Sequence, residues 1–338
     1  MSEPLVSILI PAFNSQKWIA DTLRSAIAQT WDRKEIIVVD DGSADNTLGI
    51  ARQFESKTLR VFQQKNQGGP AARNTALSLS QGDYIQWLDH DDLMDSTKIS
   101  RQMAARHRCQ SNRTLLSCAW GHFIYRQNAA RFVPTSLWTD LSPTEFLLRK
   151  MSENIFMQTS NWLVSRELSE AAGPWDTSML TDDDGEYFCR VLMASDGTRF
   201  VPGAKVYWRS SGTAQASYMG RSQKKLEAQW SSILLHMNYL RSLEDSPRTR
   251  AACVKYLQNW MIYFYPERMD ITARAQEIAK ELGGQLETPR LSWKYDWFRM
   301  LFGWSTAKHI RLLLPSTRWS LIRWWDHVLF RLERPKTA

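Results

Sequence analysis

The chain carries the stretch Tyr84-Ile85-Gln86-Trp87-Leu88-Asp89-His90-Asp91-Asp92, in which three carboxylates follow directly on an apolar run. A run of this length with aromatic and β-branched members predicts a strand buried on both faces. In open α/β sheets, ligands bind where such strands end. Asp89 and Asp91 are spaced to turn toward one Mg²⁺ or Mn²⁺ that takes its other ligands from diphosphate oxygens and water. The alternative is a solvated acidic turn that caps the following helix.

Around this stretch, strand and helix signals alternate at short spacing, which predicts βαβ units and a parallel sheet covered on both faces. We expect strands at residues 6–11, 35–39, 59–63 and 84–88, and helices at 15–29, 45–54, 68–79 and 98–107. Shorter strands follow around 115–125 and 200–208, and helices at 219–242, 249–264 and 271–282. The predicted organisation is an α/β domain over residues 1–218 and a helical region over 219–338.

Composition narrows the class of protein. The 338 residues suffice for one large α/β domain with an appendage, and the four cysteines contain no C-x-x-C pair, which argues against a zinc knuckle or a disulfide framework. The N-terminus shows no basic and apolar leader, and no run of about 18 apolar residues occurs. We therefore expect a cytoplasmic protein without a membrane-spanning helix. The formal charge of +8 alone does not choose among nucleic acid, acidic lipid and anionic substrates.

Two further segments near predicted strand ends suit a nucleotide. Asp40-Asp41-Gly42-Ser43 offers carboxylates for a nucleobase N–H or a ribose hydroxyl, although a tight turn with a helix cap is the simpler explanation of this segment alone. Residues 66–74 contain Gly68-Gly69 at a helix start and Arg73, which suits a phosphate or a uracil-like carbonyl. The loop matches neither the dinucleotide-binding nor the P-loop pattern.

Taken together, residues 6–14, 38–43, 66–74 and 82–92 resemble, in order and spacing, the motifs of family 2 glycosyltransferases. The resemblance covers roughly residues 4–215. It implies the GT-A fold, a Rossmann-like mixed sheet, together with a nucleotide-sugar donor and inversion at the anomeric carbon.

The resemblance also assigns roles to individual positions. For the donor it implies Pro11, Ala12 and Asn14 beside the nucleoside, Asp40 on the base, Asp41 near the ribose and Arg73 on the nucleotide. Asp89 and Asp91 match the D-x-D pair, with Asp91 the metal ligand and Asp89 on the ribose or on the metal through water. His90 occupies the variable middle position and is expected to be a bystander.

A second acidic group, Asp182-Asp183-Asp184, precedes a predicted helix and resembles the acceptor motif of the family. Inverting transfer needs one carboxylate to take the proton of the acceptor hydroxyl. The alignment makes Asp184 the catalytic base and Asp183 its neighbour, in the place of the usual Glu. The alternative is N-capping of the helix by these acids.

A departure from the family lies at Tyr207-Trp208-Arg209-Ser210-Ser211, where many relatives have a histidine in place of Ser211. Metal binding would then rest on Asp91, diphosphate and water, or activity would be reduced. Arg209 is expected on the diphosphate, with an ordinary strand residue as the equal alternative.

The C-terminal third interleaves aromatic and basic residues. They are Trp293, Trp297, Phe298, Phe302, Trp304, Trp319, Trp324, Trp325 and Phe330, and Lys294, Arg299, Lys308, Arg311, Arg318, Arg323 and Arg331. Such a mixture favours peripheral contact with an anionic membrane surface, in two short segments separated by Pro315. Packing against the protein or a partner subunit is the alternative, and nothing upstream resembles a nucleic-acid-binding module. Arg318-Trp319 lacks the rest of the Q-x-x-R-W motif of processive synthases, which favours transfer of a single sugar.

The sequence thus predicts a metal-dependent, inverting hexosyltransferase. It would move one sugar from a UDP-sugar to a hydroxyl of a glycan or lipid-linked acceptor, in the assembly of cell-surface polysaccharide or glycolipid. Two alternatives stay open: a nucleotidyltransferase, and a non-catalytic subunit that binds a nucleotide-sugar.

Overall fold

The computed structural model describes residues 3–109, 111–210, 222–289 and 296–333, without the side chains of 296–299, 302 and 309–319. The chain forms two compact units. Unit 1 contains Met1–Phe123, Ala130–Leu147 and Phe156–Arg209, and unit 2 contains Ile124–Ala129, Leu148–Ile155 and Ser210–Ala338. The predicted domain boundary near residue 218 falls outside the described residues and stays a prediction.

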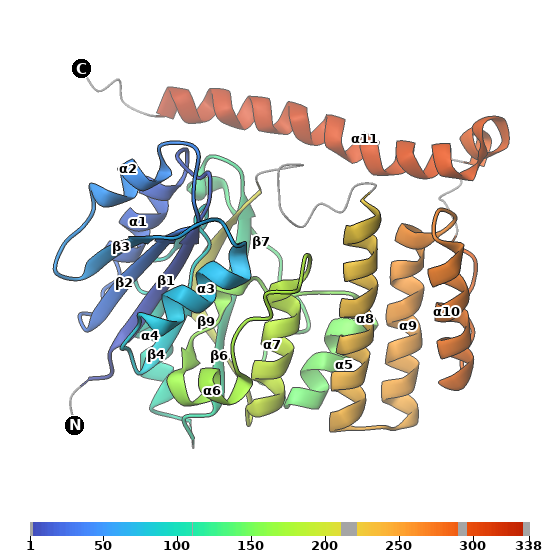
Figure 1. Cartoon of the computed structure of the whole chain (residues 1–338), viewed down its shortest axis with the longest axis horizontal. Coiled ribbons are helices and arrows are strands. Elements are labelled where there is room, and N and C mark those ends of the chain that lie inside the picture. The colour runs from blue at the N-terminus through green and yellow to red at the C-terminus, as the bar shows by residue number, and fades with distance from the viewer. Residues whose placement is uncertain (1–2, 110, 211–221, 290–295, 334–338) are drawn as a thin grey trace. The chain divides into compact units, whose positions relative to one another are not determined.

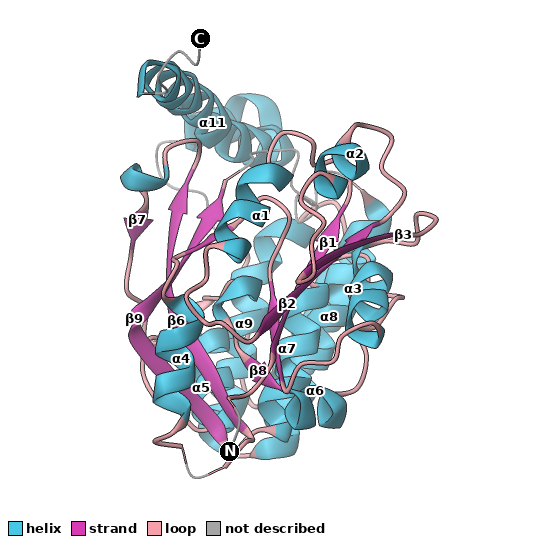
Figure 2. Cartoon of the chain, turned by 90° about the vertical axis from the view of Figure 1, so that its left-hand side faces the viewer, coloured by secondary structure: helices cyan, strands magenta, loops and turns pink. Residues whose placement is uncertain are grey.

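The first sheet of unit 1 has the strand order β3-β2-β1-β4-β8, and Figure 2 labels β3, β2, β1 and β8 of this sheet. The strands are β1 (Val6–Ala12), β2 (Lys34–Asp40), β3 (Leu59–Gln63), β4 (Tyr84–Trp87) and β8 (Val164–Ser165). The first four are parallel, because helices α1 (Ile19–Ile27), α2 (Thr47–Arg52) and α3 (Gly69–Ser78) make the crossovers, whereas β8 is antiparallel to β4. All residues of β1 and β4 are buried, which confirms the strand predicted before Asp89.

The second sheet has the order β5-β9-β6-β7 and mixes directions, since β6 and β9 are parallel and the outer strands antiparallel. Its strands are β5 (Leu93–Met94), β6 (Thr114–Phe123), β7 (Arg131–Phe132) and β9 (Gly197–Arg209). The remaining helices before residue 210 are α4 (Lys98–Arg106), α5 (Pro143–Glu153), α6 (Arg166–Ala172) and α7 (Asp183–Ala194), with short 3₁₀ turns at Gln127–Ala129 and Thr159–Asn161. The predicted α/β class with a mixed sheet is confirmed.

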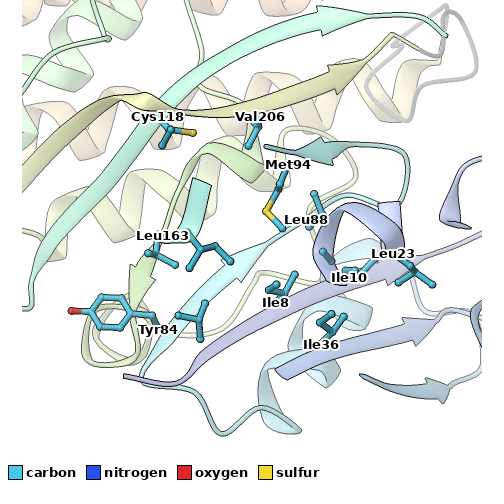
Figure 3. Close-up of a cluster of buried hydrophobic side chains, with 14 of the residues drawn as sticks. Ile8, Ile10, Leu23, Ile36, Tyr84, Leu88, Met94, Cys118, Leu163 and Val206 are labelled. Carbon is cyan, nitrogen blue, oxygen red and sulfur yellow. The ribbon is translucent and has the colours of Figure 1, made fainter. Parts of the chain in front are cut away.

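One apolar core joins the two sheets of unit 1. Ile8 of β1 and Ile36 of β2 lie in the same buried cluster as Cys118 of β6 and Val206 of β9 (Figure 3). Burial of apolar surface stabilises such a cluster by roughly 25 cal/mol per Å². The strands are therefore held rigidly, and so are the loops at their ends.

A charged side chain lies within this core. Lys98, at the start of α4, is fully buried, and its ammonium group donates to Oε1 of Gln86 on β4. Burial lowers the pKa of Lys98 to about 8 because the charged form loses its hydration. Gln86 in turn donates through Nε2 to the carbonyl oxygen of Ser160, at 2.9 Å.

Unit 2 is helical. Helices α8 (Gln223–Leu243), α9 (Pro247–Phe264) and α10 (Met269–Glu281) lie side by side (Figure 1), and α11 spans Asp296–Glu333. A capping box of Ser246 and Thr249 starts α9. The predicted helical C-terminal region is thus confirmed. Among the described residues, no helix is both long enough and apolar enough to cross a membrane.

The predicted break at Pro315 is wrong. Helix α11 continues through this residue, and its non-helical position is Gly303, with φ 77° and ψ 169°. A glycine takes a positive φ at little cost, whereas the φ that the proline ring imposes is itself a helical value.

Candidate active site

Arg73 of α3 joins the two acidic groups that the sequence singles out. Its Nη1 donates to Oδ2 of Asp183 at 2.7 Å, and its Nη2 donates to Oδ1 of Asp89 at 3.0 Å. The guanidinium also lies over the ring of Trp175, 4.5 Å from the centroid. Burial opposes its charge, but the carboxylates of Asp183 and Asp89 outweigh burial and raise the pKa of Arg73. We call this arrangement the Arg73 bridge.

Within the acidic tetrad, Asp92 is buried and fully used by the fold. Its Oδ1 accepts from the backbone N–H of Arg209 at 2.8 Å, and its Oδ2 accepts from Gln158 Nε2 at 2.5 Å. Burial and the charge of Asp91 raise the pKa of Asp92 well above its ordinary value. Asp92 therefore fixes the loop rather than presenting a carboxylate to a ligand.

Asp91 has a different environment. In the described part of the chain, no other side chain donates a hydrogen bond to its carboxylate. Burial, partly offset by His90, raises its pKa, and the neighbouring Asp89 adds to the rise. A carboxylate with free lone pairs beside a second acid is a hard-oxygen donor set that fits Mg²⁺ or Mn²⁺. The described residues contain no group of three or more His, Cys, Asp or Glu side chains that could hold a metal ion.

Arg209 ends β9 beside this loop. Its Nε donates to the carbonyl oxygen of Asp91 at 2.7 Å, and its guanidinium lies between the rings of Trp18 and Phe123, 4.2 and 4.4 Å from their centroids. These contacts hold the tetrad in place. The predicted contact of Arg209 with a diphosphate stays a prediction.

Asp40 and Asp41 end β2 with different partners. Asp41 accepts from Gln64 Nε2 and from the backbone N–H groups of Gln67 and Gly68, at 2.7 to 2.9 Å. Asp40 accepts at Oδ2 from the Ser43 backbone at 3.2 Å, while its buried Oδ1 has no hydrogen-bond partner among the residues that the structure describes. An unpaired buried carboxylate oxygen suits the N–H of a bound nucleobase. Asp41 holds the loop that leads into α3 and thus to Arg73, and its predicted place near the ribose stays a prediction.

Hydrogen bonds join the end of β1 to the segment that follows β2. The Ala12 carbonyl oxygen accepts from the Asp41 N–H at 2.8 Å, and Asn14 Oδ1 accepts from the Ala44 N–H, also at 2.8 Å. Pro11 pairs with Val39 in the sheet. Gly42 has φ 70°, and a Cβ there would meet the backbone nitrogen of Asn66 at 2.9 Å, so this turn requires glycine.

The acceptor-side acids start α7. Asp182 precedes the helix with φ 57°, and Gly185 leaves room for its carboxylate, which a Cβ at that position would meet at 2.1 Å. Asp184 accepts from Thr159 Oγ1 at 3.1 Å. Burial and the charges of Asp183 and Asp182 raise the pKa of Asp184 to about 7, against the opposing effect of Arg73. A carboxylate with this pKa is matched to proton transfer near neutral pH.

The structure thus brings together Arg73, Asp89, Asp183 and Asp184, with Asp91 two positions after Asp89, near the carboxyl end of β4 and the start of α7. Pro11, Ala12, Asn14, Asp40 and Asp41 form the neighbouring group around the β1 and β2 ends. Ser211, Gly212 and Thr213 lie outside the described residues, so the departure at Ser211 stays untested. In the C-terminal region the same holds for Trp293 and Lys294, and for the side chains of Trp297, Phe298, Arg299, Phe302, Arg311, Arg318 and Trp319.

Sequence reasoning missed three contributors. Gln158 and Thr159 bind acids of both clusters, and Asn74 makes a reciprocal pair with the backbone of Trp175, at 2.9 and 2.8 Å. Trp175 stacks on Tyr187, 4.1 Å between centroids, which links the Arg73 bridge to α7. The polar run at 158–161 between apolar residues was the only available signal, and it does not say what the side chains bind.

The fold is a two-sheet α/β architecture in which acidic and basic side chains gather at the strand ends. Residues 7–172 match the family model described as glycosyl transferase family 2. The predicted family is confirmed.

A curated relative supports the same family. The putative teichuronic acid biosynthesis glycosyltransferase TuaG of Bacillus subtilis is 38% identical over 104 residues, which cover 30% of this chain. The chain spans about two fifths of the length of TuaG and of other curated relatives that it matches.

Solved structures show the fold. S. aureus TarS 1–349 in complex with UDP superposes with a TM-score of 0.63 at 18% identity, over 82% of this chain and 80% of that one. The mannosyltransferase PcManGT from Pyrobaculum calidifontis, in complex with GDP-Man and Mn²⁺, has a TM-score of 0.52 at 17% identity, over 96% and 88% of the chains. These likenesses confirm the predicted GT-A fold.

Proposed function

We propose that this protein is a metal-dependent, inverting glycosyltransferase. It moves a single hexose from a UDP-sugar to a hydroxyl of a glycan or lipid-linked acceptor. The observation that carries the proposal is the Arg73 bridge, which gathers donor-side Asp89 and acceptor-side Asp183 on one buried guanidinium. The match to the family model supports sugar transfer, and the UDP bound by TarS supports the choice of nucleotide. The name of TuaG supports a role in cell-surface polysaccharide or glycolipid assembly.

On the donor side, the unpaired Oδ1 of Asp40 accepts the N–H of the base, and Pro11, Ala12 and Asn14 flank the nucleoside. Asp91, with Asp89 beside it, would hold the Mg²⁺ or Mn²⁺. When bound, that ion neutralises the charge that develops on the leaving diphosphate. Arg73 holds Asp89 in place and adds positive potential beside the nucleotide.

On the acceptor side, Asp184 takes the proton of the attacking hydroxyl while the oxygen bonds to the anomeric carbon, opposite the departing diphosphate. Asp183 stays bound to Arg73 and raises the proton affinity of Asp184. Because the pKa of Asp184 is about 7, the base is ionised above this pH and protonated below it. We expect the transfer rate to rise with pH up to about 7 and then to level off.

Product analysis tests the proposal and separates it from the alternatives. Wild-type protein with Mn²⁺ and a panel of UDP-sugars should release UDP, which chromatography detects. Release of pyrophosphate would indicate nucleotidyl transfer, and nucleotide binding without transfer or donor hydrolysis would indicate a binding subunit. Asp91→Ala should abolish the Mn²⁺ dependence of UDP binding; if this variant binds and turns over the donor as the wild type does, the metal assignment fails.

Contact with an anionic membrane surface is proposed for α11. Leu321, Trp324, Trp325 and Leu332 share one helical face by their spacing, and Trp324 and Trp325 are 62% and 57% exposed. The opposite face is occupied, because Asp326 and Glu333 each accept from Arg126 at 2.8 Å. Neutralised acids and exposed tryptophans suit the headgroup layer.

Flotation with anionic liposomes tests this surface. The double variant Trp324→Ala/Trp325→Ala should float several-fold less than the wild type. His327→Gln is the control variant, because His327 lies against Tyr125 rather than on the exposed face. It should float to the same extent as the wild type. Equal flotation of wild type and double variant would refute the membrane contact.

A further inference from the structure

A short turn behind the site reaches both acidic clusters. Gln158 donates through Nε2 to Asp92 Oδ2 at 2.5 Å and to Asp89 Oδ2 at 3.4 Å. The next residue, Thr159, donates through Oγ1 to Asp184 Oδ2 at 3.1 Å. We call residues 158–161 the linking turn, because adjacent side chains contact acids that lie about ninety positions apart in the sequence.

Buried side-chain amides hold the linking turn in place. Gln86 donates to the Ser160 carbonyl at 2.9 Å, and Gln102 donates to the Asn161 carbonyl at 3.1 Å. Asn161 donates to the Cys118 carbonyl of β6 at 2.9 Å. Because Gln86, Gln102 and Asn161 are fully buried, a shift of the turn would leave polar groups unpaired in the core. The turn is therefore a rigid support.

Such rigidity has a chemical use. Inverting displacement needs the base and the leaving group on opposite sides of one carbon, at a separation fixed to a fraction of an ångström. The Arg73 bridge restrains this separation through Asp89 and Asp183. The linking turn adds a second restraint, because it contacts Asp89 and Asp184 directly.

Resting on the proposed glycosyl transfer, we propose that Gln158 and Thr159 are positioning residues that hold donor-side Asp89 and the base Asp184 at a fixed separation. Gln158 acts on the donor side. Thr159 acts on the base, and its hydroxyl stabilises the ionised carboxylate against the charges that face it from α7, which are Asp182 and Asp183, and against Asp89. Arg73 is the cation that faces Asp184 from α3.

The first experiment compares Thr159→Val with Thr159→Ser. Valine keeps the shape and loses the donor, so the proton affinity of Asp184 should rise by roughly three- to tenfold, or about 0.5 to 1 pH unit. The Asp184 carboxyl is followed by carbon NMR titration, assigned with Asp184→Asn. Thr159→Ser should restore the wild-type titration. An unchanged titration in Thr159→Val, or an equal shift in Thr159→Ser, would overturn the role of Thr159.

The second experiment compares Gln158→Met with Gln102→Met. Both remove a buried amide, but only Gln158 contacts the acids. Calorimetric binding of UDP with Mn²⁺ should weaken by about tenfold in Gln158→Met and by less than twofold in Gln102→Met, at similar losses of thermal stability. Equal weakening in both variants would overturn the role of Gln158.

The two proposals fail in distinguishable ways. A wild-type protein without transfer or donor hydrolysis refutes the proposed function, whereas the NMR titration needs no turnover. An unshifted titration refutes only the positioning role.

Discussion

The acidic clusters at residues 89–92 and 182–184 have nearly the same composition and different surroundings. In the first, Asp92 is satisfied by the Arg209 backbone and by Gln158, while Asp91 receives no bond from another side chain in the described chain. In the second, Asp184 receives one side-chain donor, Thr159, and its pKa rises to about 7. The donors around an acid, rather than the acid itself, decide whether it supports the fold, binds a cation or takes a proton.

The largest expected effect is that of Asp184→Asn. Loss of the base should lower the transfer rate by about 10²-fold or more, measured as UDP release, while UDP binding with Mn²⁺ stays within twofold. Retained transfer would assign the base elsewhere.

Asp184→Asn, although it should lose activity, is also expected to gain stability at alkaline pH. A pKa raised from 3.8 to about 7 means that the folded protein loses stability as pH rises from 3.8 to about 7, because in this range the unfolded carboxyl has released its proton and the folded one keeps it. Asp184→Asn should therefore unfold at higher urea concentration than the wild type at pH 8, and at equal concentration at pH 4. A variant that is less stable at pH 8 would contradict the pKa.

An intermediate effect is expected for Arg73→Gln, which removes the link between the clusters. Two charge-assisted hydrogen bonds are lost, so kcat/KM should fall by about 10- to 100-fold. The acid limb of the pH profile should also move upward, because Arg73 lowers the pKa of Asp184.

Arg190→Gln is the matched control for this prediction. Arg190 sits on α7 but pairs with Glu186, at 2.7 Å, away from the two clusters. Its replacement should cost stability and leave the acid limb in place. If both variants shift the limb alike, the Arg73 bridge is not the link.

The smallest expected effect is one on stability, and it separates Asp91 from Asp92 within the first cluster. Asp92→Ala leaves buried donors unpaired and should lower the free energy of unfolding by about 1 to 3 kcal/mol, measured with urea. Asp91→Ala should change it by less than about 0.5 kcal/mol. Equal losses would mean that both acids serve the fold.

The strands and the site's outline were predictable because short patterns determine them. The apolar run before Asp89 and the helix start at Gly69 each depend on neighbours in sequence, and the family motif supplied Arg73. The contact of Gln158 with Asp92 spans 66 positions, and no local pattern encodes it. Asp41 illustrates the same limit, since nothing in its neighbours in sequence predicts its hydrogen bonds from the backbone N–H groups of Gln67 and Gly68.

Helix α11 shows a different limit. A proline in an otherwise helical pattern favours a break, because it lacks a backbone N–H and its ring crowds the preceding turn, yet α11 continues through Pro315 and has its non-helical value at Gly303. The aromatic and basic composition did not reveal that Arg126 would bind Asp326 and Glu333.

The contribution of Lys98 to the protein's stability rises with pH between about 8 and 10.5. Its folded pKa of about 8 lies below the ordinary 10.5, so between these values the unfolded chain binds a proton that the folded chain has released. Stability from this group is full above pH 10.5 and is lost as pH falls through about 8. At neutral pH, burial of the Lys98 ammonium group therefore opposes folding. Two hydrogen bonds, from Lys98 to Gln86 and from Gln86 to Ser160, connect this group to the linking turn.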